Sequence, residues 1–161
     1  MAKGYLVNHM KMRYINDRFK IVKPKSEDFS EIFPLLEQLW SYKKFNKKML
    51  KRIFISGLNR TQQQYLIAKQ GRKILGFAAL TITNSLWDEG NSCYIDALVV
   101  DRNHRGRGVG RELMKTITKI AKKKKCKSIN FDSALFRKNA HSFYKEQGFK
   151  KYNAFLFSKS I

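Results

Sequence analysis

The apolar positions in the first part of the chain follow two different periods. Residues 19–22 form a short strand candidate that ends before Pro24, and the polar run 26–28 then provides a helix-start signal. Apolar side chains recur at helical spacing over residues 29–40, which predicts an amphipathic helix. Because Pro34 falls early in this segment, either the first turn is irregular or the helix begins later.

A second helix is expected over residues 46–56. We expect Met49 and Ile53 on its inward face, joined by Leu50, because these apolar residues lie at helical spacing. Gly57 follows directly and can adopt the left-handed conformation that ends many helices. The helix is therefore expected to stop at this glycine.

Strands dominate the middle of the chain. Residues 64–69 and 73–83 favour strands, and the tight turn 70–72 between them predicts a hairpin. A loop is expected over residues 84–91. The segment 92–100 that follows is almost continuously apolar, which is typical of a central strand buried on both faces.

The last third alternates between helical and strand patterns. We expect a helix over residues 108–123, a strand over 127–131, a short helix over 139–147 that Gly148 ends, and one or two strands over 149–158. This order of elements predicts an α/β fold with a mixed, mostly antiparallel central sheet flanked by helices on both faces.

The chain of 161 residues has the length of a single domain. Residues 1–17 carry no clear period, so we expect an N-terminal extension, in part a cloning remnant or the result of a start at Met10 or Met12. Residues 18–161 would then form one domain. The sequence shows no apolar run of about 18 to 20 residues and no secretion signal, which favours a soluble, cytoplasmic protein without membrane partners.

The charge of the chain is strongly basic, with 34 Lys and Arg against 12 Asp and Glu, a net charge of +22. Such a field attracts polyanions without specificity. The alternative is a solvated lysine-rich surface, because the basic residues are spread from end to end. Cys93 and Cys126 lie far apart and only three histidines are present, so we expect neither a disulfide nor a metal site.

A glycine-rich turn lies between the apolar strand and the helix over residues 108–123. Glycines allow a ligand to approach the backbone closely, and the N–H groups at the start of a helix favour phosphate oxygens. Arginine side chains in the same turn can add charged hydrogen bonds. An anion site is therefore expected at Arg105, Gly106, Arg107, Gly108, Val109 and Gly110, although these residues match neither common nucleotide-binding fingerprint.

The run Arg105-Gly106-Arg107-Gly108-Val109-Gly110 resembles the R/Q-x-x-G-x-G/A signature of the GNAT superfamily of acetyl-CoA-dependent N-acetyltransferases. The resemblance implies that the amides of this loop hold the pyrophosphate of acetyl-CoA. It also implies a GNAT-like acyl-CoA N-acyltransferase fold. In this family the strand before the loop binds the pantetheine arm through its backbone, and the corresponding residues here are Leu98, Val99 and Val100.

A second motif, residues 140–149, resembles the A-x-x-F-Y-x-x-x-G-F helix of the same family. It implies that Tyr144 is the general acid, and a phenol with a pKa near 10 is still protonated at neutral pH. The alternative is a packing role on its helix face. Where the family often has Asn, this chain has Arg137, with Asn139 two places later; both are candidates for contacts with the cofactor.

Asp96 is the candidate general base, because it is a carboxylate in an otherwise apolar strand and the resemblance places a base at this position. Desolvation would raise its pKa. A buried Asp satisfied by hydrogen bonds is the alternative. Trp87, Asp88 and Glu89 are candidates for contacts with the acceptor substrate, whereas Cys93 is expected to be a small core residue without a catalytic role.

These motifs together predict an enzyme that moves the acetyl group of acetyl-CoA to a primary amine, most simply of a small molecule, by direct attack in a ternary complex. A protein or peptide N-acetyltransferase is one alternative. A non-catalytic nucleic-acid- or ribosome-associated protein on the same fold is another, motivated by Lys122–Lys125. A homodimer is compatible with the sequence.

Overall fold

The computed structural model of the chain describes residues 19–154 and 156–161. It contains two compact units, one ending at Phe131 and a second that spans Asp132–Ile161. The extension expected over residues 1–17 lies outside the described residues, and the expected single domain remains a prediction. In the part of the chain that the structure describes, no helix is both long and apolar enough to cross a lipid bilayer.

The first unit is built on a five-stranded sheet whose strands lie in sequence order. Neighbouring strands pair antiparallel from β1 to β4, and β5 pairs parallel to β4. The mixed, mostly antiparallel sheet predicted from the sequence is confirmed. The strands are β1 (Lys20–Val22), β2 (Gln63–Gln70), β3 (Lys73–Ser85), β4 (Gly90–Val100) and β5 (Cys126–Asn130).

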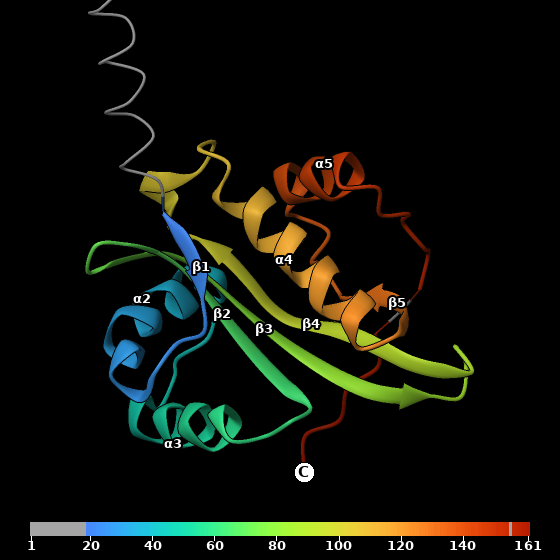
Figure 1. Cartoon of the computed structure of the whole chain (residues 1–161), viewed down its shortest axis with the longest axis horizontal. Helices are drawn as coiled ribbons and strands as arrows, with labels where there is room; N and C mark the ends of the chain where they lie inside the picture. Colours follow the sequence, from blue (N-terminus) through green and yellow to red (C-terminus); the bar gives the residue numbers. More distant parts are fainter. Residues whose placement is uncertain (1–18, 155) are drawn as a thin grey trace, which may run out of the picture. The chain divides into compact units, whose positions relative to one another are not determined.

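Three helices cover the two faces of this sheet: α2 (Phe29–Leu39), α3 (Lys47–Leu58) and α4 (Val109–Lys123). α2 packs on β3 and β4 and α3 packs on β2, whereas α4 crosses the opposite face (Figure 1). Two parallel strands need a crossover connection, and α4 supplies the connection between β4 and β5. The predicted flanking of the sheet by helices is confirmed.

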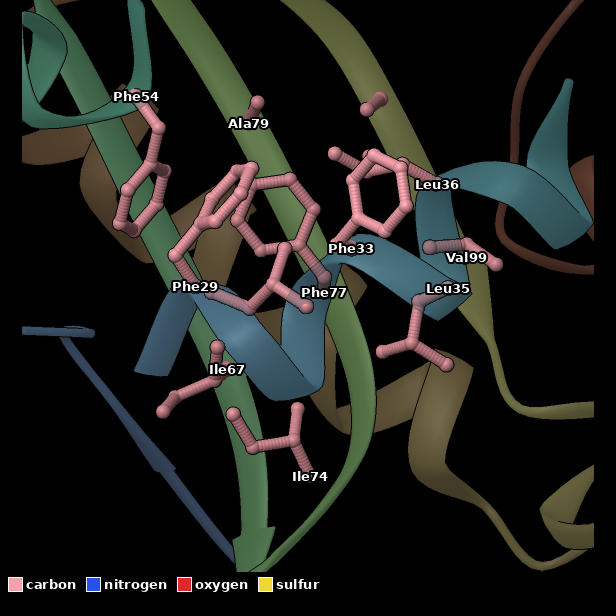
Figure 2. Packing of buried hydrophobic residues seen from close by; sticks show 12 residues of the cluster. Phe29, Phe33, Leu35, Leu36, Phe54, Ile67, Ile74, Phe77, Ala79 and Val99 are labelled. Carbon is pink, nitrogen blue, oxygen red and sulfur yellow. The ribbon is translucent and has the colours of Figure 1, made fainter. Parts of the chain in front are cut away.

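Aromatic rings fill the space between the sheet and the helices α2 and α3. Phe29 of α2, Phe54 of α3 and Phe77 of β3 lie close together (Figure 2). The ring centroids of Phe29 and Phe54 are 5.4 Å apart. Burial of one such side chain contributes about 1.5–3 kcal/mol. The same cluster includes Ala97 and Val99, so this core also fixes β4.

The contact between α4 and the sheet depends on a glycine. A Cβ on Gly76 of β3 would lie 2.9 Å from the carbonyl oxygen of Val99 and 3.1 Å from the side chains of Val109 and Leu113. Real Cβ atoms rarely approach their neighbours so closely. Glycine at this position therefore lets the start of α4 pack directly against β3, beside the carbonyl of Val99.

The inward face of α3 differs from the prediction. Phe54 is buried and Leu50 packs against the core, whereas Met49 and Ile53 are 50% and 54% exposed. Residues four apart share a helix face, so burying the large ring of Phe54 brings Leu50 inward and turns Ile53 outward. The prediction is therefore confirmed for Leu50 and wrong for Met49 and Ile53.

Gly57 does not end α3, which also contradicts the prediction. The helix continues to Leu58, and Gly57 lies within it at an ordinary negative φ. A Cβ at Gly57 would overlap the Tyr65 hydroxyl. The glycine is thus present for the close approach of β2 and not for a left-handed turn.

Pro34 lies inside α2 without displacing its start. A 3-10 turn, η1 (Ser26–Asp28), leads directly into the helix at Phe29. The expected later start is wrong, and the only irregular turn in this described segment is η1, which precedes the helix.

The described residues of the second unit contain the helix α5 (Lys138–Glu146). Gly148 follows it at φ 85°, and the N–H of Phe149 donates to the carbonyl of Tyr144 at 3.0 Å, which is the bonding pattern of a Schellman motif. The predicted helix and its glycine stop are confirmed. The strands expected over residues 149–158 are not found in the described residues of that segment.

Candidate functional site

The ladder between β3 and β4 is interrupted near its middle. Ala79 pairs with Ala97 and the next pair is Leu80 with Ile95, so Asp96 is an extra residue on β4. A bulge of this kind bends the strand and reverses the face on which each later side chain lies. Apolar residues before and after the bulge can therefore be buried while Asp96 itself is not.

The pairing of β4 with β5 stops beside this bulge. The register joins β5 to β4 only from Asn91 to Tyr94. No strand in the described part of the chain pairs with this edge of β4 over residues 95–100. An unpaired edge offers backbone N–H and C=O groups to a ligand. The open segment includes the residues predicted to bind the pantetheine arm, Leu98, Val99 and Val100.

Asp96 is exposed, which corrects the expectation of a carboxylate inside a strand buried on both faces. The hydroxyl of Thr81 donates a hydrogen bond of 2.6 Å to its carboxylate. Neighbouring atoms still displace water from the carboxylate, and this desolvation raises the pKa of Asp96 although the Thr81 hydrogen bond opposes the rise. A raised pKa brings a carboxylate closer to the range of a useful general base.

The glycine-rich loop passes from β4 into α4 through a short 3-10 turn, η2 (Arg102–His104). Gly106 and Gly108 have φ of 74° and 82°, values that favour glycine. Gly108 is the N-cap of α4, and no side chain caps the helix there. The first N–H groups of α4 thus lack an intrahelical acceptor and suit an anion.

The two arginines of this loop are placed differently. The Nε of Arg105 donates to the carbonyl of Val100 at 3.2 Å, which folds its side chain back on the end of β4. Arg107 is exposed. The structure therefore brings Arg105, the three glycines and the open end of β4 together in one region of the first unit.

A hydrogen-bonded network holds the start of this loop. The buried carboxylate of Asp101 accepts from the N–H of Asn103 at 3.2 Å and lies 2.9 Å from Nδ1 of His104. Gln38, on the last turn of α2, also bonds to Asp101 and accepts from the N–H of Arg102 at 3.0 Å. Burial alone would raise the pKa of Asp101, but these hydrogen bonds together lower it.

The sequence did not single out Thr81, Gln38 or Asp101. Asp101 directly precedes a turn and bonds to the N–H two residues later, so the preference of Asp for such turns was a usable signal. Thr81 and Gln38 act across distant parts of the chain, and no local pattern marks them.

The hairpin between β3 and β4 places Trp87, Asp88 and Glu89 at its tip. The ladder extends to the pair of Ser85 with Gly90, so the predicted loop is shorter than expected. Trp87 is 93% exposed, and the carboxylate of Asp88 accepts from Ser128 at 2.8 Å. β4 rises about 3.4 Å per residue, so the structure does not bring this tip together with the bulge. Its contact with an acceptor remains a prediction.

Tyr144 lies on α5 in the second unit. Its ring is 5.5 Å from that of Phe143 and 6.4 Å from that of Phe149. Burial raises the pKa of Tyr144 and the Arg137 guanidinium opposes this rise, so the phenol is protonated at neutral pH. Arg137 is the N-cap of α5, and Asn139 is exposed in its first turn.

Cys93 is fully buried in β4. Burial raises the pKa of its thiol to about 12, so the side chain remains a neutral thiol. The structure gives it the environment of the small core residue predicted from the sequence.

Comparison with known proteins identifies relatives of this fold. A model of the acetyltransferase (GNAT) family matches residues 27–149. The thialysine N-epsilon-acetyltransferase of Bos taurus is 24% identical over 140 residues, which cover 80% of this chain and 82% of that protein.

Solved structures share the arrangement of elements at low sequence identity. A transcriptional regulator from Bacillus halodurans C-125 superposes with a TM-score of 0.81 at 21% identity, covering 88% of this chain and 99% of the other. An aminoglycoside acetyltransferase from an uncultured soil metagenomic sample, in complex with sisomicin, gives 0.76 at 19% identity, covering 91% and 99%.

Proposed function

The chain belongs to the GNAT family of acetyltransferases, and on this premise we propose that it transfers the acetyl group of acetyl-CoA to a primary amine of a small molecule. One observation carries the proposal: the bulge at Asp96, the open edge of β4 and the uncapped start of α4 follow one another within a single unit. These features offer a carboxylate, a row of backbone groups and an anion site in that order along the chain.

The loop residues fit the pyrophosphate of acetyl-CoA. A Cβ built on Gly106 or Gly108 would meet no described atom within 4 Å, so the backbone there is open to a ligand. The N–H groups at the start of α4 and the guanidiniums of Arg105 and Arg107 would bind the phosphates. Backbone groups of residues 98–100 would hold the pantetheine arm.

Bound acetyl-CoA supplies an activated thioester carbonyl. In our proposal, N–H groups of the open edge of β4 donate to the oxygen of this carbonyl and stabilise the charge that develops during attack. Asp96 accepts the proton that the amine must lose. The raised pKa of Asp96 and its exposure to an incoming amine both support this role.

Tyr144 is proposed as the general acid that protonates the departing thiolate. The raised pKa of its phenol keeps the proton available at neutral pH. Arg137 and Asn139, at the start of the same helix, are proposed to contact the cofactor, where an arginine would suit a phosphate.

The acceptor is proposed to be a small molecule with a primary amine. Two relatives support this class by name, one an acetyltransferase of thialysine and the other of aminoglycosides. Direct attack in a ternary complex is favoured because Cys93 is buried and protonated and so is unsuited to carry the acetyl group.

A steady-state assay of CoA release tests the proposal. We expect release to require both acetyl-CoA and a small primary amine, and to fall by about 10²–10⁴-fold in Asp96→Asn. Glu31→Gln, which removes an exposed carboxylate from α2, serves as the matched control and should retain activity. Turnover with peptides and none with small amines would contradict the proposed acceptor class.

A further inference from the structure

Three polar residues lie together where α3 ends and β2 begins. The Tyr65 hydroxyl and the amide oxygen of Gln63 both reach Gly57, where a Cβ would overlap them. The backbone N–H of Arg60 donates to the carbonyl of the same glycine at 3.1 Å, which fixes the backbone of Arg60 beside them. The cluster of Arg60, Gln63 and Tyr65 is therefore built around one point at the end of α3.

The hydrogen-bonding groups of this cluster are available to a ligand. Among the described residues, the Tyr65 hydroxyl and the Gln63 amide make no hydrogen bond, and no carboxylate pairs with the Arg60 guanidinium. Arg60 is exposed, while Gln63 and Tyr65 are half-buried. The Arg60 guanidinium and the phenolic O–H of Tyr65 are donors suited to a carboxylate or a similar anion, and the Gln63 amide can add an N–H from the NH2 group that it carries beside its oxygen.

The cluster lies on the same face of the sheet as Asp96. Gln63 pairs across the ladder with Thr81, and the Thr81 hydroxyl bonds to Asp96. Cross-strand partners project from the same face. Burial raises the pKa of Tyr65, the Asp96 carboxylate adds to this rise and the Arg60 guanidinium opposes it, so Tyr65 lies within electrostatic range of both charges.

The distance between the two groups limits the shape of a ligand. β2 and β4 are separated by β3, and adjacent strands lie about 4.8 Å apart, so the cluster and the bulge are on the order of 10 Å apart. An amine at Asp96 and an anion at the cluster must therefore be separated by several bonds. The amine and carboxylate of a simple α-amino acid are too close together to reach both.

We infer that Arg60, Gln63 and Tyr65 bind the carboxylate of an acceptor whose reacting amine lies several bonds away at Asp96. The inference rests on the proposed function and specifies its substrate class as amines that carry a remote carboxylate. It also accounts for specificity, because an acceptor that lacks the carboxylate would leave three donors unpaired.

Two acceptors that differ only in the anion test this inference. 6-Aminohexanoate carries a carboxylate where n-hexylamine carries a methyl group, and kcat/KM is measured for both with the full chain. We expect 6-aminohexanoate to be preferred by at least about tenfold, the effect of a charged hydrogen bond. In Arg60→Gln the preference should disappear, and Arg60→Lys should restore part of it.

Arg52→Gln is the matched control, because it removes one exposed arginine from α3 without altering the cluster. It should leave the preference as in the native protein. Equal use of both acceptors by the native protein, or an unchanged preference in Arg60→Gln, would overturn the inference while leaving the acetyltransferase proposal intact.

Absence of turnover with every amine would instead count against the proposed function. Calorimetric titration of 6-aminohexanoate into the protein then decides the inference independently. Binding that is lost in Arg60→Gln and kept in Arg52→Gln supports the carboxylate site, and no binding to the native protein overturns it.

Discussion

The Thr81 hydroxyl donates a hydrogen bond of 2.6 Å to the carboxylate of Asp96, across strands β3 and β4 and at the bulge between them. The bond orients the carboxylate of Asp96, the extra residue that the bulge inserts into β4. It also opposes the desolvation that raises the pKa of Asp96. Thr81 is thus placed to tune the proposed base as well as to position it.

Removal of the Thr81 hydroxyl should move the acidic limb of the pH profile. A general base acts when deprotonated, so activity rises as the pH passes through the pKa of Asp96. Thr81→Val removes a bond that lowers this pKa, and the limb of kcat/KM should move to higher pH. Thr81→Ser keeps the hydroxyl and should retain the native profile; an unmoved limb in Thr81→Val would contradict the role of Asp96.

Strain in the glycine loop should weaken the binding of acetyl-CoA. Gly108 has φ 82°, and Gly108→Ala would force a side chain into a conformation that costs about 1–2 kcal/mol. We expect calorimetry to show roughly tenfold weaker binding of acetyl-CoA. Gly71→Ala, at φ 57° in the β2–β3 turn, imposes similar strain away from the loop and should reduce stability alone. Equal losses of affinity in both variants would argue against a specific loop site.

Loss of the Tyr144 hydroxyl should lower kcat without unfolding the chain. Tyr144→Phe keeps the ring that packs near Phe143 and Phe149 but removes the proton donor. The expected fall in kcat is about 10²–10⁴-fold at neutral pH. Tyr152→Phe alters an exposed ring and is the control. Unchanged kcat in Tyr144→Phe would assign Tyr144 to packing.

The ion pair of Asp28 with Lys69 should make stability depend on pH. Lys69 Nζ and the N–H of Lys25 each lie 2.8 Å from the Asp28 carboxylate. Burial alone would raise the pKa of Asp28, but these partners lower it, so the stabilisation is present above the pKa of the unfolded chain and is lost as the pH falls through the folded value.

Asp28→Asn should therefore lower the free energy of unfolding by about 1–3 kcal/mol near neutral pH, because a buried partner is lost. The difference from the native protein should shrink as the pH falls below about 4. Urea unfolding across this pH range measures both effects, with Glu27→Gln as an exposed control. A difference that does not change with pH would contradict the assigned charge interaction.

Much of this fold could be read from the sequence where local physics decides the outcome. The glycines at 108 and 148 mark the start of α4 and the end of α5 because both need a positive φ. α3 could not be oriented in the same way, since the burial of Phe54 against β2 is a tertiary effect. Gly57 shows the same limit, because its partner Tyr65 belongs to another element.

The candidate site divides in a similar way. The glycine loop and the motif containing Tyr144 have local signatures, so both could be selected as candidates from the sequence. The bulge has no local signature. The extra residue at Asp96 reverses the alternation of side chains, so the buried residues before it and after it lie on opposite faces of the sheet. In the sequence, such a strand looks like one that is buried on both faces. The sequence therefore identified Asp96 while predicting the wrong environment for it.

The most direct test of the central claim is a calorimetric titration of acetyl-CoA into the native protein and into the Gly108→Trp, Gly110→Trp double variant. Circular dichroism of both proteins is the control for folding. Our account predicts one-to-one binding to the native protein and its loss in the variant, because two indole rings would cover the uncapped start of α4. Absence of binding to the folded native protein would contradict the account.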